Sequence, residues 1–234
     1  MRPMSDHRNG GCFTHHVDVD RVAAASSAVT TERAAPERAR PEPVVFLPGL
    51  LCDQSLWRRQ IDALADCCAP FVADLTLDDS IAAMAERTLT AAPPSFSLVA
   101  LSMGGYVALE IVRQAPERVR RLALIDTSAR PDTPERTRER LRGIQSLERG
   151  KFLGVSRPLL RPLVHRAHWE DAVATAMQAM AGRVGKSASV RQQRAIMDRP
   201  DSRDHLGDIA VPTLIVVGRQ DRIRPWTMRA SCTR

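Results

Sequence analysis

The sequence predicts an α/β protein with a mostly parallel sheet flanked by helices. Five short apolar runs recur along the chain, and several are continuous rather than alternating, which is typical of parallel strands buried on both faces. Helical stretches lie between the first runs, as expected for strands joined by right-handed crossovers. Between the last two runs, about 65 residues from Pro134 to Pro200 show no strand pattern.

The five predicted strands are bounded by residues that end or turn a chain. Pro48 and Gly49 follow the first strand, and Gly218 follows the last. Between the early strands, apolar residues recur at helical spacing. The strands are predicted at 44–47, 71–75, 96–101, 122–125 and 211–217, and the helices between them at 54–64, 80–89 and 103–114.

Residues 134–200 are predicted to form a helical cap. A first helix opens at Pro134 and closes at Gly150, a second over 169–181 ends near Gly182, and a third over 187–199 is stopped by Pro200. A helical insertion between two parallel strands is expected to cover the carboxyl edge of the sheet, where such folds bind ligands.

The remaining residues divide into a tail and a core. Residues 1–42 have no periodicity and are rich in Ala, Arg, Ser, Thr and Pro, so they are predicted to be a disordered extension. The core comprises residues 43–133 and 201–234. With 44% apolar and 26% charged residues, the chain has the composition of an ordinary globular protein.

Several locations and partners are excluded by the sequence. No uncharged apolar run is long enough to span a membrane, and the first 30 residues lack the apolar segment of a secretory signal. The five cysteines show no metal or redox spacing, and their odd number argues against a disulfide framework. We therefore expect a protein of the reducing cytoplasm with no membrane partner and no metal site.

The net charge of +7 is concentrated in one segment. Residues 129–200 carry 15 basic and 7 acidic side chains, and only two of the 34 basic residues in the chain are lysine. This arginine excess is most simply a codon bias, so nucleic acid is not expected as a partner. The alternative is a cap that binds anionic ligands.

Ser102 lies at a predicted strand-to-helix turn. Such a turn points its serine outward and requires small neighbours, because strand and helix backbones come close together. Ala100, Gly104 and Gly105 meet this requirement, and the pattern A-x-S-x-G differs from the nucleophile elbow G-x-S-x-G only in its first residue. The helix N-terminus also places N–H donors beside the hydroxyl. The alternative role of Ser102 is that of a helix N-cap.

Acyl transfer needs donors for a developing oxyanion and a carboxylate that orients a histidine. The backbone N–H groups of Leu50, in the turn after the first strand, and of Met103, directly after Ser102, are the predicted oxyanion donors. Asp221, in the loop after the last strand, is the predicted acid. Asp126, after the fourth strand, is the alternative, although an aspartate there more often holds the neighbouring loop.

These stretches resemble the α/β-hydrolase fold superfamily, and within it small esterases, lactonases and haloperoxidase-like proteins with a helical cap. The resemblance covers about 180 residues and lies in LPGLLCD (47–53), ALSMGGYVALEI (100–111), APERVRRLALIDTSARPDTPE (115–135) and GRQD (218–221). It implies that Ser102 is the nucleophile, Asp221 the acid, and Leu50 and Met103 the oxyanion donors. It implies no cofactor and no metal.

The family also requires a further strand, a loop with the general-base histidine, and a final helix. Only 13 residues follow Asp221, and none is a histidine. We therefore expect a chain that is truncated relative to the family, lacks its general base, and exposes the edge of its last strand, across which a homodimer could form. His165 or His168 of the cap is the alternative source of a base.

The function predicted from these features is that of a serine hydrolase acting on a carboxylic ester or a lactone. The missing histidine is expected to impair it, because a serine hydroxyl is a poor nucleophile without an adjacent base. The alternatives are a catalytically inactive, truncated remnant or a small-molecule-binding protein. The expected partner is a small ester-like substrate.

Overall fold

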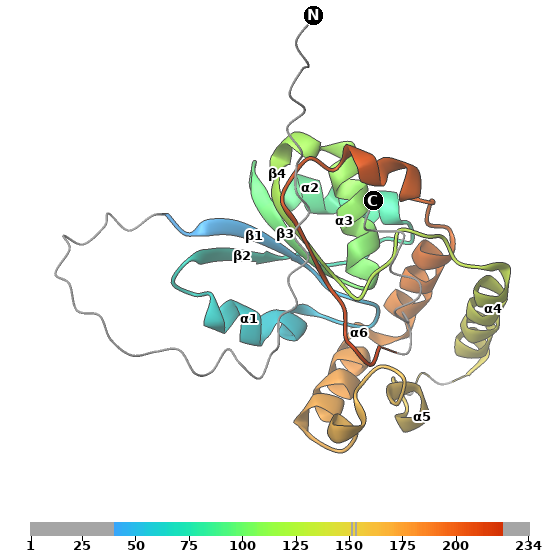
Figure 1. Ribbon diagram of the computed structural model, residues 1–234. Helices are drawn as coiled ribbons and strands as arrows, with labels where there is room; N and C mark the ends of the chain where they lie inside the picture. Colours follow the sequence, from blue (N-terminus) through green and yellow to red (C-terminus); the bar gives the residue numbers. More distant parts are fainter. Residues whose placement is uncertain (1–39, 151, 153, 222–234) are drawn as a thin grey trace, which may run out of the picture.

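The structure is a computed structural model that describes residues 40–150, 152 and 154–221 (Figure 1). The predicted disordered extension, residues 1–42, lies almost entirely outside the described residues. The predicted loss of the final strand and helix concerns residues 222–234 and lies outside them as well.

The predicted parallel sheet is confirmed. Its strands are arranged in the order β2-β1-β3-β4-β5, and every neighbouring pair is parallel. Val45 at the middle of β1 is paired with Phe71 of β2 and with Leu98 of β3, so β1 is buried on both edges. The strands are β1 (Glu42–Leu47), β2 (Cys68–Val72), β3 (Phe96–Leu101), β4 (Val119–Ile125) and β5 (Thr213–Val216).

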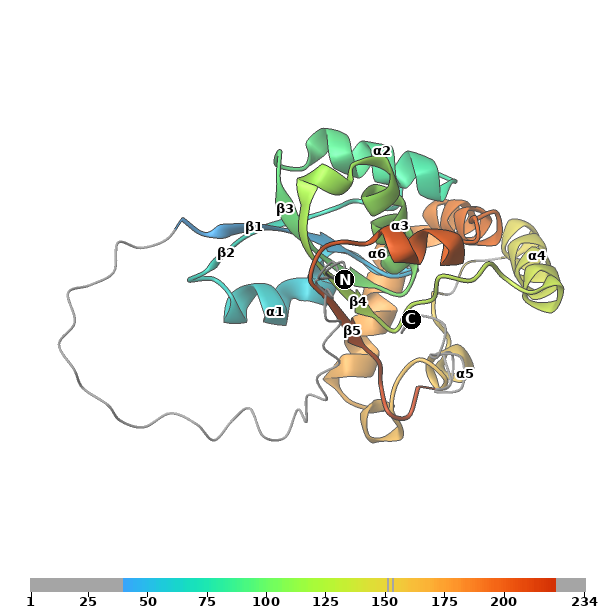
Figure 2. The same ribbon diagram turned by 45° about the horizontal axis from the view of Figure 1, so that its top comes forward.

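Helices cover both faces of the sheet. Successive residues of a strand point to opposite sides, so each strand presents side chains that pack against the helices on both faces. Val45 and Leu47 belong to the main core with residues of α2 and α3, whereas Phe46 packs on the other face, where its ring lies 5.3 Å from that of Trp57. Figure 2 shows α1 on one side of the sheet and α2 and α3 on the other. The helices are η2 (Gln54–Trp57), α1 (Arg58–Ala63), α2 (Ile81–Ala91) and α3 (Met103–Gln114).

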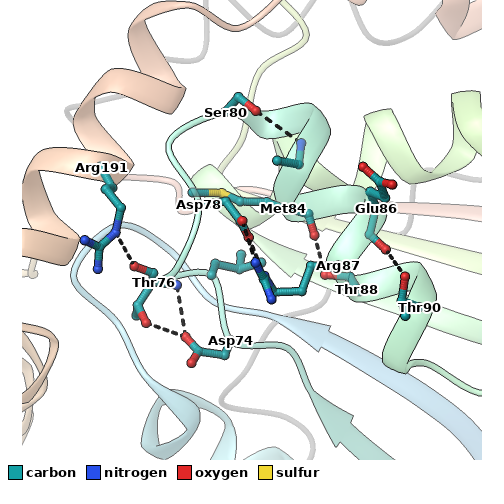
Figure 3. Close-up of polar contacts among 12 residues, drawn as sticks. Asp74, Thr76, Asp78, Ser80, Met84, Glu86, Arg87, Thr88, Thr90 and Arg191 are labelled. Carbon is teal, nitrogen blue, oxygen red and sulfur yellow. Dashed lines mark hydrogen bonds and ion pairs between the residues drawn. The ribbon is translucent and has the colours of Figure 1, made fainter.

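β2 starts and ends three residues earlier than predicted. The Asp74 carboxylate accepts hydrogen bonds from the backbone N–H of Thr76 at 2.9 Å and from its hydroxyl at 2.6 Å, and this turn follows the end of the strand (Figure 3). Leu75 lies in the loop but is 2% exposed and packs in the main core. The strand predicted at 71–75 therefore includes Leu75, an apolar residue that tertiary packing buries in a loop.

Between β4 and β5 the described residues form helices and turns but no strand. The predicted gap between the second and third cap helices, residues 182–186, contains the break that the structure shows: Gly185 within α6 has non-helical dihedral angles, with φ 77°. Ala181, before this break, is fully buried with neighbouring cap residues. The elements are α4 (Pro134–Arg149), α5 (Arg157–Leu160), η4 (Arg166–His168) and α6 (Ala172–Met197), with η3 (Pro116–Arg118) before β4 and η5 (Arg203–Asp208) before β5.

β5 lies at one edge of the described sheet. It pairs with β4, and no strand within the described ranges pairs with its other side. Leu214 and Val216 of β5 are each 38% exposed. The helices in the part of the chain that the structure describes are too short or too polar to cross a membrane.

Candidate active site

The backbone of Ser102 is held in a strained conformation at the turn between β3 and α3. Its φ of 51° lies in the left-handed region, which costs a residue with a side chain about 1–3 kcal/mol. The Ser102 N–H donates to the carbonyl of Ile125 at 2.9 Å, and its own carbonyl accepts from Gly105 N–H and from the Thr127 hydroxyl. Ser102 occupies the N-cap position of α3, but its side chain makes no capping hydrogen bond. The alternative role of Ser102, in which its hydroxyl caps the helix, is therefore wrong.

Gly104 and Gly105 allow the first turn of α3 to lie against two strand ends. A Cβ on Gly104 would lie 2.8 Å from the carbonyl oxygen of Pro48, after β1. A Cβ on Gly105 would lie 2.5 Å from Cβ of Thr127, after β4. Any side chain at either position would push the helix away from the sheet and move Ser102 with it.

The turn after β1 lies beside Ser102. It is closed by a hydrogen bond from Cys52 N–H to the Gly49 carbonyl at 3.1 Å, and Leu51 within it has a φ of 60°. A Cβ on Gly49 would lie 3.7 Å from Cβ of Ser102, which shows how closely the turn approaches the elbow. Leu50, the predicted oxyanion donor, lines the same cavity as Ser102.

A glutamine of the cap holds this turn. Gln192 of α6 is fully buried; its Oε1 accepts from Leu51 N–H at 3.0 Å, and its Nε2 donates to the carbonyl of Leu75 at 3.0 Å. Sequence reasoning missed Gln192. The available signal was a polar residue at helical spacing between Ala188 and Ala195, which are both buried.

The two candidate acids follow adjacent strands. The Asp126 Oδ1 accepts from Gly218 N–H at 2.8 Å, and the Asp126 N–H donates to the carbonyl of Val216 at 2.9 Å. Asp126 therefore holds the loop after β5. Within that loop, the Asp221 N–H donates to the Gly218 carbonyl at 3.1 Å, and both carboxylates line the cavity with Ser102.

This cavity has a volume of about 1190 Å³ and lies between the carboxyl ends of the strands and the cap. Its floor includes Leu50, Ser102 and Asp221, and cap residues form the opposite wall. His165 is the one histidine of the described residues that lines it. His168 lies nearby in the sequence, but its Nδ1 pairs with the Asp171 carboxylate at 2.6 Å.

Cap and core are joined by two further groups of polar contacts. Arg183 of α6 pairs with Asp53 at 2.6 Å next to the turn after β1. Burial opposes ionisation of Asp53, but hydrogen bonds from Arg183 and Ser55 outweigh it and lower the pKa of this carboxyl. Burial, reinforced by the charge of Asp53, raises the pKa of the Cys52 thiol to about 11.

The second group is a buried ion pair. The Arg199 guanidinium lies 2.9 Å from the Asp132 carboxylate and 4.3 Å from the centre of the Tyr106 ring, and Arg140 pairs with the same carboxylate. Burial opposes ionisation of Asp132, but the two arginines outweigh it and lower its pKa. Since Tyr106 lines the cavity, this pair ties the start of the cap to the base of the site.

A parallel sheet with a serine at a strained strand-to-helix turn, below a helical cap, defines an α/β hydrolase. The chain belongs to the Alpha/beta hydrolase family, whose sequence profile matches residues 44–234. No group of three His, Cys, Asp or Glu side chains that could hold a metal ion is found among the described residues.

Among curated proteins, the chain is similar to pimeloyl-[acyl-carrier protein] methyl ester esterases of Neisseria meningitidis. It is 28% identical over 169 residues to those of serogroups C and A, which is 68% of this chain and 63% and 52% of the respective relatives. The chain thus spans less than two thirds of the length of these relatives.

Two solved structures have the same fold. An esterase from Thermogutta terrifontis, solved with malate bound, has a TM-score of 0.71 and 26% identity, over 81% of this chain and 76% of the esterase. The enol-lactonase from Burkholderia xenovorans LB400 has a TM-score of 0.70 and 19% identity, over 84% of this chain and 80% of the lactonase.

Proposed function

We propose that this α/β hydrolase cleaves a carboxylic ester or a lactone through a covalent acyl-serine intermediate on Ser102. The observation that carries the proposal is the conformation of Ser102, which is strained, unused in capping, and placed at the floor of the large cavity. The Ser102 hydroxyl attacks the carbonyl carbon, and the N–H groups of Leu50 and Met103 stabilise the oxyanion. Asp221 is the acid that orients the base.

The proton of the Ser102 hydroxyl must pass to a base and then to the leaving alcohol. Among the described residues, His165 is the histidine that lines the cavity. We propose that the described residues contribute mainly stabilisation of the oxyanion, so that ester hydrolysis supported by them alone is slow. Loss of one triad member leaves about 10³–10⁴-fold catalysis over water in enzymes of this kind.

The experiment is labelling with a fluorophosphonate together with turnover of p-nitrophenyl acetate. We expect slow labelling on Ser102 and none after Ser102→Ala, with His165→Ala as the variant that tests the cap histidine. A methyl ester is a further test substrate, since the Neisseria relatives are named for cleaving one. No labelling of the folded parent chain would overturn the proposal and favour the inactive remnant or the small-molecule-binding protein.

Location and assembly remain part of the proposal. We propose a cytoplasmic protein, supported by three free cysteines in the described residues, Cys52, Cys67 and Cys68. We also propose that two copies associate across the edge of β5, where Leu214 and Val216 present apolar side chains.

A further inference from the structure

The charges around the cavity are unequal. Two carboxylates line it, those of Asp126 and Asp221, and both follow strands of the sheet. Arginines outnumber them, and most come from the cap side. The arginines that line the cavity are Arg136, Arg140, Arg161, Arg166 and Arg219.

These arginines are not equivalent. Arg140 pairs with Asp132 and also donates to the Gln193 side chain, so its charge is compensated within the protein. For Arg161 and Arg166, by contrast, no carboxylate of the described residues lies within ion-pair distance. At Arg161 and Arg166 the cap wall of the cavity therefore carries positive charge that no ion pair within the described ranges neutralises.

Arg161 is also held in place. Its guanidinium carbon lies 5.3 Å from the centre of the Trp169 ring, and Trp169 in turn donates from its indole N–H to the carbonyl of Val164 at 3.0 Å. A guanidinium stacked on an aromatic face keeps the donors along its edges available, and those donors match the two oxygens of a carboxylate. Arg161 is thus oriented before any ligand arrives, which lowers the entropy lost on binding.

Apart from His165, the rest of the cap wall is mainly apolar. Val155, Leu163, Met177 and Met180 line the cavity, so a ligand that reaches Arg161 passes along surface suited to methylene groups. A cavity of about 1190 Å³ admits a small molecule, whereas a macromolecular anion could contact only its rim.

We propose that the substrate is a small ester that carries its own carboxylate, a monoester of a dicarboxylic acid, with the free carboxylate bound by Arg161 and further attracted by Arg166. The ester part of this inference rests on the proposed function, but the anion-binding part does not. The apolar wall would hold the methylene groups between the carboxylate and the ester carbonyl at Ser102.

The test measures binding without turnover. In the full chain carrying Ser102→Ala, titration calorimetry compares monomethyl glutarate with dimethyl glutarate, which has the same skeleton and no charge. We expect the monoester to bind at least tenfold more tightly at low salt, a preference that falls as ionic strength rises. Arg161→Gln should remove about tenfold of this preference, and Arg166→Gln a smaller part.

The matched control is Arg142→Gln, since Arg142 is an exposed arginine of α4 that does not line the cavity. It should leave both affinities unchanged. If Arg161→Gln lowers the melting temperature, Arg166→Gln and the salt dependence in the parent decide the question. Equal affinities for the two esters, or a preference that survives both cavity substitutions, would overturn the inference.

The two proposals fail separately. Absence of fluorophosphonate labelling in the parent chain with a retained monoester preference would remove the hydrolase and leave an anion-binding site. Labelling on Ser102 together with equal affinities for the charged and the uncharged ester would keep the hydrolase and remove the anion-binding site. Tighter binding of methyl phosphate than of monomethyl glutarate would also overturn the assignment, because it would identify a phosphate site instead.

Discussion

Gln192→Leu should damage the site from a position in the cap that does not line the cavity. The substitution keeps a side chain of similar size but removes both hydrogen bonds that Gln192 makes, from the Leu51 N–H and to the Leu75 carbonyl, each 3.0 Å long. Leu75 is 2% exposed, so water cannot readily replace the lost donor there.

The magnitude follows from those two groups. A buried backbone group without its partner costs about 1–3 kcal/mol. Leu51 is only half-buried and its positive φ can relax once the bond is gone, which offsets part of the loss. We expect the free energy of unfolding to fall by about 2–4 kcal/mol, and labelling of Ser102 to slow at least tenfold because the Leu50 N–H loses its orientation.

Two further variants make this prediction specific. Gln178→Leu, on the same helix, removes a bond to the carbonyl of Val155 within the cap and should leave the labelling rate unchanged. Gln192→Glu should recover as pH falls, because a protonated glutamate accepts from Leu51 and donates to Leu75 as the glutamine does. Urea titration and labelling kinetics provide the readouts. Gln192→Leu with an unchanged labelling rate would refute the role of Gln192 in orienting the turn.

Three other perturbations have defined outcomes. Gly105→Ala, whose Cβ would lie 2.5 Å from that of Thr127, should lower the free energy of unfolding by more than about 2 kcal/mol in a urea titration. A loss below about 0.5 kcal/mol would contradict the tight packing at this position. The pKa of Asp132 is lowered in the folded state, so its ionised carboxylate contributes fully to the free energy of unfolding above the pKa that it has in the unfolded chain. This contribution disappears as the pH falls through the pKa that Asp132 has in the folded state. Asp132→Asn should therefore flatten the acid limb of the stability profile, and an unchanged limb would exclude Asp132 as its source. Leu214→Lys should convert a dimer into a monomer in light scattering, whereas a parent chain that is already monomeric would end the edge-pairing proposal.

The elements that were predicted best have local causes. β3 and α3 have the predicted limits, because a continuous apolar run meets a Ser-x-Gly-Gly turn and then a helical pattern. β2 begins and ends three residues earlier than predicted, whereas the break in α6 at Gly185 lies in the predicted gap between two cap helices. Burial of Leu75 by distant residues decided the limits of β2, and it leaves no local pattern.

The class of fold, the elbow at Ser102 and the candidate residues Leu50, Met103 and Asp221 can be predicted from short stretches of the chain, because each depends on residues within a few positions of one another. Which groups meet across long separations depends on how the whole chain packs. Gln192 lies 141 residues from Leu51 and 117 from Leu75, and Arg161 lines the same cavity as Ser102 only because the cap packs above the sheet. The physical reason is that periodicity encodes which face of an element is buried, whereas the partner on that face is set by packing of the whole chain.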